Sequence, residues 1–150
     1  MPRRPPLAVA LVALAAACSG PTGVDPAGVQ VAPVNGLRPA TLIDCRALKG
    51  SLPEQITPGV HRRTAEPVSD TTDAWGDPAI TLRCGVSKGR ASDDPYTFNA
   101  VHWALHDTGS SRTWTTTGLR VNVAVLIPDA YSSQAELLGG LASAILKNLD

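Results

Sequence analysis

The chain has 150 residues, room for one domain of modest size, and its 13 lysine and arginine residues balance 13 aspartate and glutamate residues. This balance leaves no basic stripe, and the six aromatic residues (three Trp, two Tyr and one Phe) offer little material for stacking bases or sugars. Nucleic acid is therefore excluded as an expected partner.

Residues 1–17 have the composition of an export signal. PRRPP is basic, and the eleven apolar residues that follow it are too few for a membrane span of about twenty. LAAAC resembles a bacterial lipobox, although Ala15 stands where Leu is commonest. We expect Cys18 to carry a diacylglycerol and to anchor the protein on the outer face of the cytoplasmic membrane. The alternative is a secreted protein cut near Ala17.

Residues 18–40 are rich in Gly and Pro and predict a flexible membrane tether. Within them, Val29-Gln30-Val31 alternates and could add a short edge strand that Pro33 ends. Residues 41–150 are expected to form a single domain.

The domain is expected to begin with a helix that Thr41 caps and Gly50 ends. Its inward positions recur at helical spacing and are Leu42, Cys45, Leu48 and Leu52. A turn-rich stretch follows as far as Pro78, with at most a short strand near residues 60–65.

Strands are predicted next, separated by turn residues rather than helices. Their ranges are 79–86, 97–105, 112–117 and 119–128. Ser133 and Glu136 have the spacing of a capping box that opens a final helix, whose leucines form an apolar stripe. The predicted fold class is α+β, an antiparallel β-meander of about four strands covered by two helices.

Cysteine usage predicts one disulfide. Three cysteines are an odd number for an exported chain, and lipidation of Cys18 leaves Cys45 and Cys84 as a pair. Both face inward in the predicted elements. The alternative is a pair of free buried thiols, which oxidising conditions outside the cell disfavour.

Candidate metal ligands have weak support. His102 and His106 lie four residues apart in a predicted strand, too far apart to share zinc, and are interpreted as solvent-facing. Asp70, Asp73 and Asp77 lack the spacing of a calcium loop and are assigned to turns and caps. We expect no metal and no cofactor.

Two features suggest a partner surface. His61, Arg62 and Arg63 form a cationic run that could contact a partner carboxylate or anionic head groups, or simply be solvated. Trp75 precedes a Gly-Asp-Pro turn, and we expect it to fold over the core edge, with exposure at a partner surface as the alternative.

Catalytic signatures are missing: the sequence has no G-x-S-x-G elbow, no S-x-x-K and no phosphate-binding glycine loop. We therefore expect a protein that is not an enzyme.

The order of a lipobox-like leader, DAWGDPAITLRCGV, AVHW and TTTGLRVNVAVLIP resembles an actinobacterial family of small exported, membrane-associated proteins without an established function. The resemblance implies a paired Cys45 and Cys84 and an association with cell-wall genes. Ala100 stands where a Gly is expected.

The leading functional hypothesis is a non-catalytic, lipid-anchored envelope accessory that binds a protein partner. A small-ligand or lipid binder, which needs a cavity between sheet and helices, is the alternative. An enzyme would need titratable groups that converge in a cleft.

Overall fold

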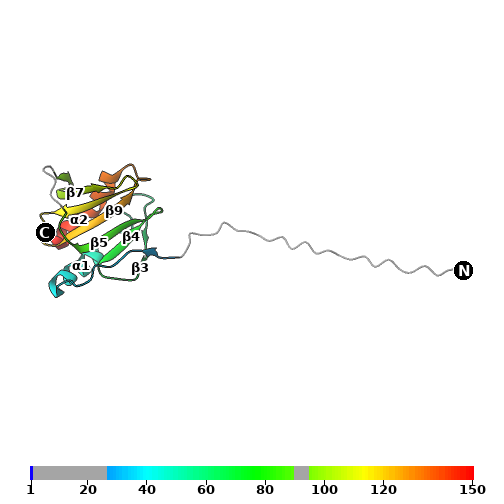
Figure 1. Cartoon of the computed structure of the whole chain (residues 1–150), viewed down its shortest axis with the longest axis horizontal. Coiled ribbons are helices and arrows are strands. Elements are labelled where there is room, and N and C mark those ends of the chain that lie inside the picture. Colours follow the sequence, from blue (N-terminus) through cyan, green and yellow to red (C-terminus); the bar gives the residue numbers. More distant parts are fainter. Residues whose placement is uncertain (2–26, 90–94) are drawn as a thin grey trace.

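The computed structural model of the chain describes residue 1, residues 27–89 and residues 95–150. These residues form two helices, a seven-stranded sheet and a two-stranded parallel sheet (Figure 1). The predicted α+β class, the two helices and the disulfide are confirmed. The expected meander of about four strands is an undercount.

The helices are α1 (Pro39–Ser51) and α2 (Gln134–Leu149). The strands of the large sheet are, in spatial order, β2 (Arg62–Arg63), β4 (Thr72–Trp75), β5 (Ile80–Val86), β9 (Asn122–Pro128), β8 (Ser111–Thr117), β7 (Val101–Asp107) and β6 (Tyr96–Phe98), and all neighbours are antiparallel. The small sheet pairs β1 (Val29–Gln30) with β3 (Ala65–Glu66).

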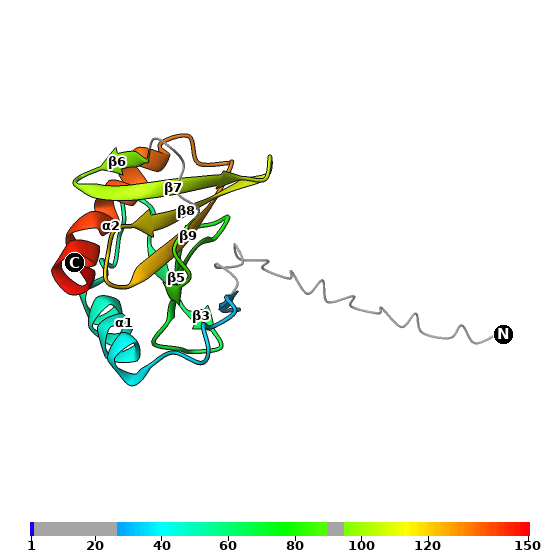
Figure 2. The same cartoon turned by 60° about the vertical axis from the view of Figure 1, so that its left-hand side comes forward.

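The large sheet is buried on one face by the two helices (Figure 2). Side chains alternate along β5, so that Ile80, Leu82 and Cys84 are buried while Arg83 is exposed. The other face, which we call the outer face, bears β1 and β3 at its β4 end, where Val31 packs with Ala74. The core therefore lies between the helices and one side of the sheet.

Strand β4 has no counterpart in the sequence analysis, and one predicted strand is in fact two strands. All four residues of β4 are buried, so the strand lacks the alternation by which a half-buried strand is found. The predicted strand 97–105 is in fact a hairpin of β6 and β7, turning at Asn99 (φ 47°) and Ala100 (φ 66°). Two consecutive positive φ angles are typical of a type I′ turn, which usually carries Gly and has none here.

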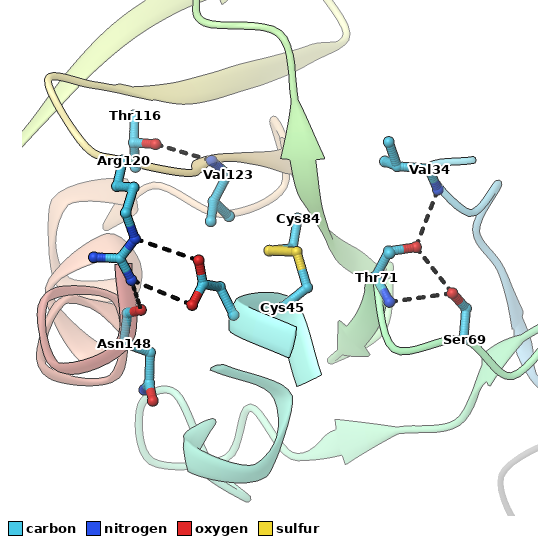
Figure 3. The surroundings of a disulfide bond; sticks show 10 residues. Val34, Cys45, Ser69, Thr71, Cys84, Thr116, Arg120, Val123 and Asn148 are labelled. Atoms are coloured by element: carbon cyan, nitrogen blue, oxygen red, sulfur yellow. Dashed lines mark hydrogen bonds and ion pairs between the residues drawn. A yellow bond between two sulfur atoms is a disulfide. The ribbon is translucent and has the colours of Figure 1, made fainter. Parts of the chain in front are cut away.

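The N-terminal end of the domain lies earlier than predicted. The short strand expected at residues 29–31 is confirmed as β1, but the residues after it, assigned to the tether, also lie against the domain. Val31 N donates to Glu66 O at 2.9 Å, and Val34 N donates to Thr71 Oγ1 at 3.0 Å (Figure 3). Burial of Val31 explains why this Pro-rich stretch is fixed in place.

The helix ends also differ from the prediction. Helix α1 begins at Pro39 instead of Thr41, because proline suits the first helical turn, and Leu42 is 36 % exposed. At α2, the side chain of Ser133 makes no capping hydrogen bond, so the expected capping box does not form. Its carbonyl oxygen accepts from Glu136 N at 3.2 Å instead. Within the described residues, neither helix has the length and hydropathy of a membrane span.

Candidate functional site

An ion pair joins the end of α1 to the edge of the large sheet. Asp73 on β4 is 2 % exposed, and its carboxylate accepts from Arg62 Nε at 2.8 Å and from Arg62 Nη2. These hydrogen bonds raise the pKa of Arg62 above its ordinary value, against the opposing effect of burial. Register places the two residues on adjacent antiparallel strands, where Arg62 pairs with Trp75.

The same pair holds the C-terminus of α1. Arg62 Nη2 donates to Lys49 O at 3.0 Å, which satisfies one carbonyl that the helix end leaves open. Lys49 Nζ donates to Thr72 O at 2.7 Å and lies 3.3 Å from Asp73 Oδ2. Two cations thus surround one buried carboxylate, as a buried charge requires.

A surface hollow of about 370 Å³ opens beside this ion pair. Its lining residues are Lys49, Glu54, Arg62, Arg63, Thr64, Ala65, Val68 and Asp73. The rim is mixed in character: the Glu54 carboxylate is 85 % exposed and Val68 is 76 % exposed. We call this feature the β2 hollow.

Arg63 is the cation of the β2 hollow with the fewest internal bonds. Its Nη1 donates to Gly76 O at 3.0 Å, and its other donors have no protein partner within the described part of the chain. The prediction that Arg63 contributes to a surface is consistent with this position. Arg62, by contrast, is committed to Asp73 and to the end of α1.

Trp75 does not lie on a partner surface. It is 0 % exposed, its Nε1 donates to Pro53 O at 2.9 Å, and Arg62 Cζ lies 6.0 Å from its ring centroid. The structural interpretation is therefore the right one, and the inclusion of Trp75 among partner-surface residues is wrong. The apolar environment beneath the sheet edge accounts for its burial.

The three histidines are not brought together. His61 is exposed next to β2 and contacts Gln55, whereas His102 and His106 are exposed on β7, near the opposite end of the strand order. His102 Nδ1 lies 2.8 Å from Thr97 Oγ1. The predicted solvent-facing positions of His102 and His106 are confirmed, and the three histidines share no cleft in the residues that the structure describes.

The three aspartates occupy separate environments. Asp70 pairs with Arg46 at 2.8 Å on the surface, and Asp77 is exposed before Pro78. Asp73 lies in a buried strand, so its assignment to a turn or a cap is wrong. The sequence analysis also missed Lys49. For Asp73, the signal in the sequence was the pattern TDAW: two residues after Asp73 comes Trp75, a residue with a high propensity for strands, which indicates that Asp73 lies in a strand.

Cys45 and Cys84 form a disulfide, with Cα atoms 5.7 Å apart, and it joins α1 to β5 (Figure 3). Near it, Arg120 Nη2 donates to Asn148 O at 3.0 Å and its guanidinium faces Asp44, so the middle of α1 is also linked to the C-terminal end of α2. Cys18, the predicted lipidation site, and residues 2–17 of the leader lie outside the described residues.

Comparison with known proteins places the chain in a family. Residues 5–150 match a family described as protein of unknown function (DUF3515). No curated protein and no solved structure matches the chain.

Proposed function

Since the chain belongs to the DUF3515 family of proteins of unknown function, we propose a role from its own residues: a non-catalytic, lipid-anchored accessory protein of the cell envelope that binds a protein partner. Cys18 carries the lipid and holds the domain on the outer face of the cytoplasmic membrane. The family resemblance associates this role with cell-wall processes. The β2 hollow is the partner's binding site.

The observation that carries the partner site is the pairing of cationic donors with an exposed apolar residue in that hollow. Arg63 has donors beyond the one that Gly76 uses, and Val68 is 76 % exposed in the same lining. A guanidinium binds a carboxylate in a fork geometry, and burial of Val68 favours a partner over water. The hollow is thus suited to a carboxylate with an apolar neighbour, as on an acidic protein surface.

The hollow is less suited to a small apolar ligand. Pockets for such ligands are lined mostly by hydrophobic and aromatic side chains. Five of the eight residues that line the β2 hollow are charged. The space between sheet and helices is filled by fully buried side chains, including Leu48, Trp75 and Leu138. The ligand-binding alternative requires a cavity between the sheet and the helices, where these side chains pack.

A site-specific photocrosslinker tests the proposal in cells. We would place it at Thr64, an exposed residue of the hollow, and at Ala47, an exposed residue of α1, as a matched control. We expect one discrete protein adduct from Thr64, absent from Ala47, and lost in Arg63→Glu and in Cys18→Ala.

An adduct that persists in Arg63→Glu, or that forms equally at Ala47, contradicts the assignment of the hollow. If no protein is captured while Arg63 amide signals shift on titration with small carboxylates, the ligand-binding alternative replaces the partner.

A further inference from the structure

The N-terminal segment meets the domain on its outer face. Val31 packs with Ala65 and Ala74, and Ala74 lies on the side of β4 opposite to the buried Trp75. Arg83, also on the outer face, donates from Nε to Ala32 O at 2.9 Å. Figure 2 shows β3 and the blue β1 segment on the side of the sheet away from α1 and α2. A chain that arrives from an anchor therefore arrives on this side.

Few residues separate the proposed anchor from this contact. Cys18 lies eleven residues before Val29, the first residue of β1. A chain of this length spans at most about 38 Å when it is fully extended. A domain of about 120 residues is roughly 35 Å across. A domain turned with its helices toward the membrane would require nearly the whole extended length.

The outer face lacks acidic side chains at the strand positions of the large sheet that the structure describes. Alternation and register assign the following residues to it: Arg63, Thr72, Ala74, Thr81, Arg83, Val86, Thr97, His102, Ala104, His106, Ser111, Thr113, Thr115, Thr117, Asn122, Ala124, Leu126 and Pro128. The acidic residue at its border is Glu66, in the small sheet.

Lys88, on the segment that follows β5, is a second exposed cation of this region. The segment 87–89 crosses the outer face, since a Cβ at Gly89 would lie 3.0 Å from that of Ala104 and 3.1 Å from that of Thr115. Arg83 and Lys88 are both exposed. Residues 90–94, which include Asp93 and Asp94, lie outside the described residues.

We propose that the outer face, through Arg83, Lys88 and the threonine-rich surface of β8, docks on anionic phospholipid head groups beside the anchor. The inference rests on the proposed function in one respect, that Cys18 carries the lipid. The tether keeps the face at high effective concentration near the membrane, so weak contacts suffice. Each cation contributes a factor of about five to association with an anionic surface. Docking leaves α1 and α2 turned away from the membrane.

The test uses the mature chain from Cys18 coupled to a maleimide phospholipid in nanodiscs. With Cys45 and Cys84 oxidised, Cys18 is the one reactive thiol of the chain. Discs of phosphatidylcholine with and without phosphatidylglycerol carry a paramagnetic head group, and amide signals report proximity. We expect broadening at Thr113, Thr115 and Leu126 in the anionic discs and none along α1 and α2.

Matched charge reversals separate docking from general attraction. Arg83→Glu with Lys88→Glu is expected to return the broadening at Thr115 to the level seen with phosphatidylcholine alone. Arg38→Glu with Lys147→Glu changes the net charge equally on the two helix ends and is expected to leave it unchanged. Amide spectra without discs confirm that both variants are folded.

Broadening centred on α1 or α2, spread evenly over the surface, or equal in neutral discs would overturn the proposal. Because the lipid is attached chemically in this test, the result does not depend on whether cells attach a lipid to Cys18. Mass spectrometry of the N-terminal peptide from the protein isolated from cells tests that lipidation separately. An unmodified Cys18 contradicts the lipid anchor alone, whereas a lipidated Cys18 without outer-face broadening contradicts docking alone.

Discussion

Arg62 and Asp73 hold α1 against the edge of the sheet through one buried ion pair. Arg62 Nε donates to Asp73 Oδ1 at 2.8 Å while Arg62 Nη2 donates to the backbone oxygen of Lys49 at 3.0 Å. The pair thus links two strands and a helix end, and it forms the floor of the β2 hollow. Loss of this ion pair should therefore lower the free energy of unfolding of the domain.

Asp73→Asn is expected to destabilise the domain by about 3 kcal/mol, because it removes the buried counter-ion of the Arg62 guanidinium, whose other carboxylate contact, Glu54, is 85 % exposed. Asp70→Asn removes an exposed pair with Arg46, which solvent screens, and should destabilise the domain much less. Urea denaturation of both variants measures the difference. Equal losses in the two variants would show that burial of Asp73 has no energetic role.

The disulfide closes a loop with a sequence separation of 39 residues. In the chain-entropy model, such a loop contributes about 4 kcal/mol to the free energy of unfolding. Replacement of both Cys45 and Cys84 by Ala is expected to lower stability by about that amount.

Reductant provides the control for this loss. Dithiothreitol should reduce the stability of the wild-type chain and leave that of the double variant unchanged, as measured by urea denaturation. Sensitivity of the double variant to dithiothreitol would contradict the assigned pairing.

The sequence predicted the helices and strands that bury one face and expose the other, because their apolar residues recur at a regular spacing. The stripe of α2 and the alternation of β5 and β9 follow from burial on one side, so the patterns match the structure. The disulfide followed from the count of three cysteines, with Cys18 assigned to the lipid, and from the inward-facing positions of Cys45 and Cys84. The helix and strand predictions depend on local pattern alone.

The parts that the sequence did not predict depend on contacts between distant segments. Asp73 reads as a turn residue until Arg62 and Lys49 are placed beside it, and β4 is buried on both faces because Val31 covers Ala74. The hairpin between β6 and β7 was missed because its turn contains no Gly. The β2 hollow likewise requires three separate segments of the chain.

Ala100→Gly is expected to stabilise the domain by about 0.5–1 kcal/mol. Ala100 is exposed and has a φ of 66°, where its Cβ is strained and glycine is not. The same change at Ala47, an exposed position within α1, should instead cost about 1 kcal/mol. Thermal unfolding of both variants measures the two shifts, and a destabilised Ala100→Gly would contradict the turn geometry.

Asp107→Asn tests a charge in the β7–β8 turn. Gly109 N donates to Asp107 Oδ1 at 2.8 Å and Arg112 Nε donates to Oδ2 at 2.8 Å, and these bonds lower the pKa of Asp107. Because the folded state favours the carboxylate, its stabilisation is present above the unfolded-state pKa of about 3.9 and is lost as pH falls toward the lower folded-state pKa.

The melting temperature of Asp107→Asn should therefore fall below that of the wild-type chain at neutral pH and approach it at about pH 2. Thermal unfolding at both pH values measures this convergence. If the melting temperature of Asp107→Asn is lower than that of the wild-type chain by the same amount at both pH values, the asparagine amide disturbs the turn independently of charge.

Gly140→Ala is expected to destabilise the domain by about 2 kcal/mol, although alanine is the better helix former. A Cβ at Gly140 would lie 2.3 Å from the backbone oxygen of Ile56, so α2 and the loop after α1 would have to separate. Gly50 in α1 is the matched control, because a Cβ there meets nothing within 4 Å and Gly50→Ala should stabilise by up to about 1 kcal/mol. Urea denaturation of the two variants should give shifts of opposite sign. If Gly140→Ala is instead stabilised, the loop that contains Ile56 can move away from α2 without a loss of stability. The close approach of Ile56 to α2 would then not contribute to the stability of the domain.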